Sequence, residues 1–303
     1  MAALKTYLKA LRLPFLTGSL LPVAAATALA YWLHHAFNLG FFVLNLLGVA
    51  SLHLGANLIN DYYDAFGSDP LNVNVTPFSG GSRVIQNLEL EAETVKTLAY
   101  FFLAVGVVCG LALIYAGRHW VAVFGFLGLL AGFFYSASPV QLMSLGLGES
   151  FIFLTFGPLL TLGSYYVQTD KLAPEGAAVG LPLAFLITAI IWINEFPDLE
   201  ADLAAAKRHL VSRLGLRLSR WVYAVLMLAP FASLFMLLEY FLLPDLIIAT
   251  LVALPLALRA IRLVWRTAPT DPAFVTAQVL TIQTHLFLGL TQTLALLYAA
   301  WWR

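Results

Sequence analysis

The chain has 303 residues, of which 61% are hydrophobic and only 11% are charged. A soluble domain has about half apolar and a quarter charged residues, so this composition indicates an integral membrane protein. The formal net charge is zero, which excludes a nucleic-acid-binding protein because no excess of basic residues is available to neutralise phosphates. The single cysteine, Cys109, excludes disulfides and a cysteine-based zinc site.

Apolar runs of membrane-spanning length follow one another along the chain, separated by charged residues, Pro and Gly. Only helices and closed barrels satisfy their backbone in lipid, and the alternation typical of barrel strands is absent, so the runs predict helices. The first run follows basic residues as a signal peptide does, but its length of about 20 residues favours a retained helix. We predict an all-α polytopic membrane protein with nine transmembrane helices around a central cavity, in one domain over residues 1–303. The expected spans are 14–34, 39–60, 95–116, 119–136, 150–168, 179–196, 220–240, 244–264 and 278–301.

The distribution of basic residues tests this number of spans and predicts the orientation. With the amino terminus in the cytoplasm, 13 of the 16 Lys and Arg residues fall on the cytoplasmic side, as the positive-inside rule requires. The three others are Arg118, Lys171 and Arg303. We therefore expect a protein of a prokaryotic plasma membrane with its carboxyl terminus outside. Its chemistry is expected in two long, polar cytoplasmic loops, at about 61–94 and 196–219.

The segment GANLINDYYDAFGSD, residues 55–69, closes the second span with many oxygen-bearing side chains. Four of them are spaced i, i+3, i+4 and i+7, which places them on one face of a helix: Asn57, Asn60, Asp61 and Asp64. Such a cluster is self-repelling unless a cation neutralises it. Hard oxygen ligands without a set of Cys and His favour Mg²⁺ over zinc.

A second cluster, NEFPDLEAD, closes the sixth span at residues 194–202. Asn194, Asp198 and Asp202 are each four residues apart, and Pro197 is expected to kink or restart the helix. A single Asp at a helix end is more often a cap than a functional group. Two clusters with the same spacing on one side of the membrane favour function, because ionisable groups at membrane depth are costly.

Both clusters precede basic residues, and Lys207 and Arg208 suit a diphosphate better than a metal. Two acidic clusters facing each other would hold a diphosphate through magnesium, which bridges carboxylates to substrate phosphates. The surroundings are apolar, so the diphosphate is expected to carry a lipid-soluble group. These features describe an isoprenyl diphosphate.

The segments NLINDYYDAFGSD and NEFPDLEADLAAAKRHL resemble the two Asp-rich motifs of the UbiA superfamily of intramembrane aromatic prenyltransferases. RLPFLTGSLLP, YSASPVQLMSLGLGESFIFLTFGPLLTLGSYYVQT and the nine-helix layout extend the resemblance over most of the chain. The middle block is most similar to the 1,4-dihydroxy-2-naphthoate polyprenyltransferases of menaquinone biosynthesis. The resemblance implies transfer of a polyprenyl group from an isoprenyl diphosphate to that aromatic acceptor, with two Mg²⁺ ions.

The resemblance also implies roles for individual residues. The catalytic metal ligands are expected to be Asn60, Asp64, Asp198 and Asp202, with Asp61 a further ligand. The substrate-binding residues are expected to be Asn57, Arg83, Lys207, Arg208, Tyr135, Asn194 and Arg12. The usual third acid of the first motif falls at Ser68, with Asp69 one place late. Tyr135 is followed four residues later by Pro139, where many members have Lys, and this favours the naphthoate branch over the 4-hydroxybenzoate branch.

Several interpretations stay open at this point. Glu149 is a candidate general base or a structural carboxylate. The acceptor is 1,4-dihydroxy-2-naphthoate or, in a related enzyme, 4-hydroxybenzoate, an ether lipid or a tetrapyrrole. An ion-coupled transporter also uses intramembrane acids, although these usually lie near the bilayer midplane on broken helices. A non-catalytic scaffold that binds lipid or quinone has little need for paired magnesium ligands.

Overall fold

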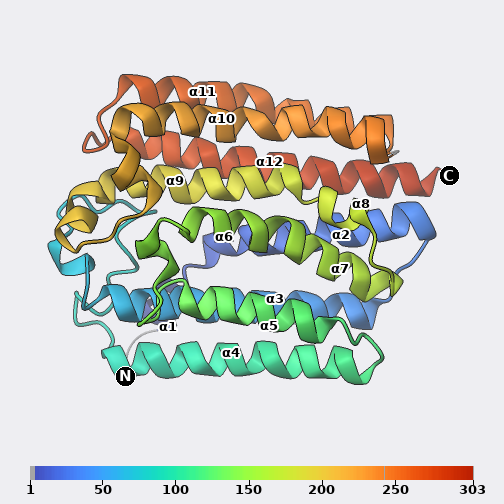
Figure 1. Cartoon of the computed structure of the whole chain (residues 1–303), viewed down its shortest axis with the longest axis horizontal. Coiled ribbons are helices and arrows are strands. Elements are labelled where there is room, and N and C mark those ends of the chain that lie inside the picture. Colours follow the sequence, from blue (N-terminus) through green and yellow to red (C-terminus); the bar gives the residue numbers. More distant parts are fainter. Residues whose placement is uncertain (1–3, 242, 303) are drawn as a thin grey trace.

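The computed structural model describes residues 4–241 and 243–302, in which every regular element is helical. This confirms the predicted all-α class. The elements are α1 Leu4–Ala10, η1 Leu13–Leu16, α2 Thr17–His34, α3 Leu39–Asp64, η2 Asp69–Leu71, α4 Ala92–Tyr115, α5 Val121–Phe134, η3 Leu142–Leu145, α6 Gly148–Leu154, η4 Thr155–Leu159, α7 Leu160–Thr169, α8 Pro174–Ala178, α9 Leu181–Ala204, α10 Leu210–Phe241, η5 Asp245–Ala253, α11 Leu254–Arg266 and α12 Phe274–Trp301. The long helices lie side by side as one bundle (Figure 1).

Eight helical segments in the described residues are long and apolar enough to cross a membrane. The one remaining predicted span, 119–136, is α5, an apolar helix of 14 residues. At 1.5 Å per residue its length is about 21 Å, which is shorter than the ~30 Å hydrocarbon core of a bilayer. Figure 1 shows α5 beside α3, aligned with the other helices. The order of apolar segments is thus the predicted one, with one of them short.

One of the predicted spans contains a break. The span at 150–168 consists of α6, the π-helical turn η4 and α7, and Gly157 inside the turn has φ −102° and ψ −108°. The following residue, Pro158, has no N–H to donate, which explains a break at this point. By contrast, α9 runs through Pro197 without interruption, so the expected restart of the helix there was wrong.

The closest helix packing joins α3 and α4 (Figure 1). A Cβ atom on Gly55 would lie 2.6 Å from Leu103 Cδ2, and one on Gly106 would lie 2.7 Å from Leu52 Cδ2. Small residues at these positions let the two backbones approach closely, as is common between helices in membranes. The larger hydrophobic core lies between α2 and α9 to α12.

The two ends of the bundle differ in the connections they carry. Figure 1 shows α1 and the C-terminal end of α12 at opposite ends of the bundle. The long connection 65–91 lies at the end that carries α1. The second predicted loop, 196–219, is largely helical, because α9 ends at Ala204 and α10 begins at Leu210. Within α10, Gly215 has φ 71° and ψ 163° and breaks the helix before the apolar part begins.

Candidate active site

A cavity of about 350 Å³ lies inside the bundle, lined by α2 to α7, α9 and the connection 65–91. On α3 its lining extends from Leu44 to Asp64, about 30 Å of helix at 1.5 Å per residue. The lining is apolar over most of this length and carries carboxylates where α3 and α9 end. The cavity therefore has a charged mouth and a long apolar interior.

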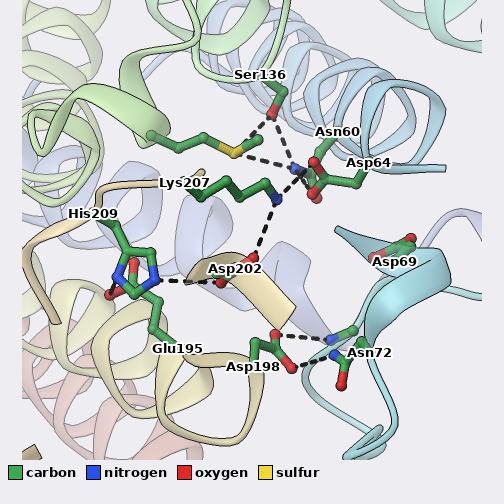
Figure 2. Close-up of polar contacts among 12 residues, drawn as sticks. Asn60, Asp64, Asp69, Asn72, Ser136, Glu195, Asp198, Asp202, Lys207 and His209 are labelled. Carbon is green, nitrogen blue, oxygen red and sulfur yellow. Dashed lines mark hydrogen bonds and ion pairs between the residues drawn. The ribbon is translucent and has the colours of Figure 1, made fainter. Parts of the chain in front are cut away.

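The end of α3 contributes Asn60 and Asp64 to this mouth. Asn60 Nδ2 donates to Asp64 Oδ2 at 2.9 Å and to Ser136 Oγ at 2.9 Å (Figure 2). The neighbouring Asp61 is not among the described residues that line the cavity. It accepts a hydrogen bond from the Ser82 N–H at 3.2 Å and faces the connection 65–91. The predicted polar face is thus split, with Asp61 directed away from Asp64.

The end of α9 contributes Asp198 and Asp202, which also line the cavity. Asp198 Oδ1 accepts a hydrogen bond of 2.7 Å from Asn72 Nδ2, and its Oδ2 accepts one of 3.0 Å from the Gly80 N–H. Asp202 Oδ2 lies 3.3 Å from His209 Nε2. The two acids of α9 are therefore held by different parts of the chain.

Lys207 joins the acids of the two helices. Its Nζ lies 2.7 Å from Asp64 Oδ1 and 3.6 Å from Asp202 Oδ1 (Figure 2). Burial alone lowers the pKa of Lys207, but the two carboxylates outweigh this and raise that pKa above its ordinary value. One positive charge thus stands between α3 and α9, at the point where their carboxylates converge.

Asp69 lines the cavity from the connection 65–91. Gln86 Nε2 donates to its Oδ2 at 2.9 Å, and Arg83 Nη1 donates to its backbone oxygen at 2.5 Å. Burial raises the pKa of Asp69 to about 7, and the negative charges of Asp64 and Asp61 act in the same direction. Arg83 is not among the described residues that line the cavity. Its side chain contacts the backbone of the connection 65–91 instead.

Of the other predicted substrate-binding residues, four line the cavity and one does not. Arg12, Asn57, Tyr135 and Asn194 line the cavity, whereas Arg208 is exposed and is not among the described residues that do so. Arg12 Nη1 lies 3.7 Å from Asp61 Oδ1. Asn194 Oδ1 accepts a hydrogen bond of 3.0 Å from Gln278 Nε2, while Asn57 Nδ2 is buried without a partner. Of the basic pair, only Lys207 faces the cavity.

Sequence reasoning missed a buried cluster beside Asp202. His209 Nδ1 lies 3.2 Å from Glu195 Oε2, and its Nε2 faces Asp202 (Figure 2). Burial lowers the pKa of His209, but the adjacent carboxylates of Asp202 and Glu195 raise it to about 10. Glu149 Oε1 accepts a hydrogen bond of 2.6 Å from the Leu210 N–H at the start of α10. The sequence could have indicated both residues, because Glu195 and His209 lie next to predicted site residues of the second motif.

Two groups of side chains are candidates for a metal site. Ligand atoms of Glu149, Glu195 and His209 all lie within 4.8 Å of one another. Both ring nitrogens of His209 already face carboxylates, so we assign this group to ion pairing. The acids of α3 and α9 offer oxygen donors of the kind that Mg²⁺ takes. Asp64 and Asp202 converge on the Lys207 ammonium, which shows that this position accommodates a cation.

Comparison with known proteins shows the family of the chain. The model of the UbiA prenyltransferase family matches residues 19–283. UbiA prenyltransferase domain-containing protein 1 of Xenopus tropicalis is 29% identical over 229 residues, which are 75% of this chain and 64% of the relative. The 1,4-dihydroxy-2-naphthoate octaprenyltransferase of Mycobacterium tuberculosis is 30% identical over 262 residues, which are 86% of each chain. The chain thus spans less than two thirds of the Xenopus relative.

Solved structures share the fold. A UbiA homolog from Aeropyrum pernix K1 superposes with a TM-score of 0.69 at 13% identity, covering 91% of this chain and 96% of that one. A UbiA homolog from Archaeoglobus fulgidus, solved bound to GPP and Mg²⁺, superposes with a TM-score of 0.62 at 17% identity, covering 97% and 99%. The family model covers the acids of α3 and α9 and nearly all the helices between which the cavity lies. The chain therefore belongs to the UbiA prenyltransferase family.

Proposed function

We propose that the protein transfers a polyprenyl group from an isoprenyl diphosphate to an aromatic acceptor, in a reaction that depends on Mg²⁺. One observation carries the proposal: carboxylates from two helices converge on a single cation, Lys207, at the charged mouth of a long apolar cavity. A diphosphate with a long hydrocarbon tail has this same division between a highly charged head and an apolar body. The Archaeoglobus fulgidus relative, which shares the fold, was solved with GPP and Mg²⁺.

The residues that would hold two Mg²⁺ ions are Asn60 and Asp64 from α3 and Asp198 and Asp202 from α9. When bound, Mg²⁺ would withdraw charge from the diphosphate and stabilise it as a leaving group. Asp69 faces the same mouth and is available as a further oxygen donor. Asp61 lies outside the cavity lining, so its contribution is to hold Ser82 and the connection 65–91.

Lys207 supplies the charge that meets the phosphate oxygens. Its ammonium is paired with Asp64 and Asp202, and a diphosphate entering between them offers it an alternative anion at the same place. Arg12 lines the same mouth, with its guanidinium 4.7 Å from the centre of the Phe15 ring. These two cations keep the leaving group in place while the prenyl carbon reacts.

The interior of the cavity holds the prenyl chain and keeps water away from the reacting carbon. Gly125 and Gly128 on α5 line it, and a Cβ atom on either one would meet nothing within 4 Å. Aromatic rings, among them Phe156 and Tyr135, also line the walls. Ring faces attract positive charge, so they stabilise the allylic cation that develops as the diphosphate leaves.

We propose 1,4-dihydroxy-2-naphthoate as the acceptor, in menaquinone biosynthesis. The support is the Mycobacterium tuberculosis relative named for this substrate, which aligns over 86% of both chains. The absence of Lys at position 139, where Pro139 stands, also supports the naphthoate branch. Parallel assays with 4-hydroxybenzoate and with a glycerol phosphate acceptor test this choice.

The test is a transfer assay with purified protein in lipid nanodiscs. Labelled geranylgeranyl diphosphate and 1,4-dihydroxy-2-naphthoate should yield a labelled lipid product in Mg²⁺. EDTA should abolish its formation and added Mg²⁺ should restore it. Donor binding without product for any acceptor would contradict the enzymatic function, and Mg²⁺-independent uptake of ions into proteoliposomes would support the transporter.

We also propose that the charged mouth faces the cytoplasm of the cell that makes the protein. The connections at that end, 65–91 and 205–209, carry Arg83, Lys207 and Arg208, in line with the positive-inside rule. The only cysteine is buried and is removed by Cys109→Ser. A cysteine placed at Asn74 should then resist a membrane-impermeant maleimide in intact cells, while one placed at Lys171 should react.

A further inference from the structure

Glu195 lines the cavity further from its charged end than Asp198 and Asp202 do. It precedes Asp198 by three residues and Asp202 by seven on the continuous helix α9. The helical rise places it about 4.5 Å and about 10 Å further along the axis from the charged end. Glu195 lines the cavity together with these acids. Its level is therefore where the apolar part of a bound donor begins.

The acids of the mouth, Asp64, Asp198 and Asp202, are the proposed magnesium ligands. Asp64 and Asp202 share Lys207, and Asp198 accepts hydrogen bonds from Asn72 and from the backbone of the connection 65–91. Glu149 caps the first turn of α10 and is not among the described residues that line the cavity. Glu195 is thus the carboxylate whose place suits contact with the organic part of the substrates.

His209 lies beside the Glu195 carboxylate. Its Nδ1 lies 3.2 Å from Glu195 Oε2, its Nε2 lies 3.3 Å from Asp202 Oδ2, and its side chain is almost fully buried. The imidazole separates Glu195 from Asp202, so the two carboxylates work at different points of the cavity (Figure 2).

A hydrogen-bond donor lies at a comparable depth on the opposite wall. Asn57 precedes Asp64 by seven residues on α3, about 10 Å along the helix axis. It lines the cavity, and its Nδ2 is buried without a hydrogen-bond partner. An unpaired buried donor costs free energy, which an oxygen atom of a bound acceptor would recover.

We propose that Glu195 takes the proton from the ring hydroxyl of the aromatic acceptor, while Asn57 donates a hydrogen bond to an acceptor oxygen. This inference rests on the proposed function. The O–H bond breaks and its proton passes to the Glu195 carboxylate, while the oxygen electron pair moves into the ring. The ring carbon then bonds to prenyl C1, and the C1–O bond breaks with its electron pair leaving on the diphosphate. The ring carbon then loses carbon dioxide from its carboxylate, or a proton that passes to the released diphosphate, and its bonding electrons restore the aromatic ring and the negative charge on the oxygen. Glu195 returns its proton to that oxygen.

The test compares Glu195→Gln with the wild-type protein on a series of hydroxynaphthoate and phenol acceptors that differ in hydroxyl acidity. The ratio of wild-type to variant kcat cancels the intrinsic reactivity of each ring. For weakly acidic acceptors this ratio should be about 100 or more, the usual contribution of general base catalysis. It should approach one for acceptors that are already ionised in the assay. Glu149→Gln removes a carboxylate of the same cluster and should give one constant ratio for all acceptors.

A structural role for Glu195 would lower kcat by the same factor for every acceptor, and that result would overturn the inference. Binding of the donor to Glu195→Gln, measured with a non-hydrolysable donor analogue, shows whether the cavity is intact. If Glu195→Gln does not fold, Glu195→Asp takes its place in the test. Its shorter side chain is still a base, so kcat should be reduced and the ratio of wild-type to variant kcat should still depend on the acidity of the acceptor. Failure of the wild-type protein to prenylate any hydroxylated ring would instead count against the proposed function.

Discussion

Asn72 Nδ2 donates a hydrogen bond of 2.7 Å to Asp198 Oδ1, although 126 residues separate the two in the sequence. The Gly80 N–H donates to the other oxygen of the same carboxylate at 3.0 Å. Gly80 has φ 76°, a left-handed conformation that glycine adopts without strain. The two bonds hold the connection 65–91 against α9, so that the connection covers the charged mouth of the cavity.

Replacing Asn72 with Ala should therefore loosen this cover. The bond joins an amide to a half-buried carboxylate, and its loss should cost about 1–3 kcal/mol. We expect faster protease cleavage within residues 73–79 and a higher KM for the prenyl diphosphate. Asn74→Ala is the matched control, because only the backbone N–H of Asn74 donates to Asn72. Equal cleavage rates for the two variants would contradict this role of Asn72.

Replacing Lys207 with Gln should leave Asp64 and Asp202 without their shared cation. Breaking a buried ion pair in this way typically costs about 3–5 kcal/mol. The thermal midpoint should fall in EDTA, and Mg²⁺ should raise it more for the variant than for the wild-type protein, because a bound cation replaces the lost charge. Arg208→Gln changes the same charge at an exposed neighbour and should show neither effect. An equal shift with Mg²⁺ in both variants would count against a cation site between these acids.

Asp64→Asn and Asp198→Asn should each reduce prenyl transfer at least about 100-fold, because each removes a charged oxygen donor from the proposed magnesium site. Raising the Mg²⁺ concentration should recover part of the lost rate. Glu200→Gln lies on the same helix as Asp198 but at an exposed position, and it should retain transfer. Turnover that persists in both Asp variants, or in EDTA, would exclude the magnesium-dependent reaction.

The pKa of about 7 for Asp69 predicts a pH dependence of stability. The ordinary value is 3.8, so between these two values the folded state holds a proton that the unfolded state has released. Stability should therefore fall as the pH rises from about 4 to about 7, by this contribution. In Asp69→Asn this contribution is absent. The thermal midpoint of the wild-type protein should therefore fall relative to that of the variant as the pH rises over that range. A difference independent of pH would show that Asp69 is ionised throughout.

The apolar segments and the two acidic clusters were predictable because their signals are local. Run length and charge determine where a chain crosses a bilayer, and the spacing in α3 placed Asn60 and Asp64 on one face, as found. The break at Gly157 and the continuity of α9 through Pro197 were not predicted. Whether a proline interrupts a helix depends on which neighbouring groups satisfy the freed carbonyl, and these neighbours come from elsewhere in the chain.

By itself, the sequence determined the helical class, the order of the spans and the segments that carry the acids, since each follows from the composition and periodicity of a short stretch. The tertiary structure alone decided that Asp61 faces the connection 65–91 while Asp64 faces the cavity, and that Lys207 points inward while Arg208 is exposed. It also brought His209 between Glu195 and Asp202. Asp61 and Asp64 differ by about 60° in direction on α3. Lys207 and Arg208 lie in the connection between α9 and α10, so in both cases only the packing of the rest of the chain fixes which side chain faces the interior.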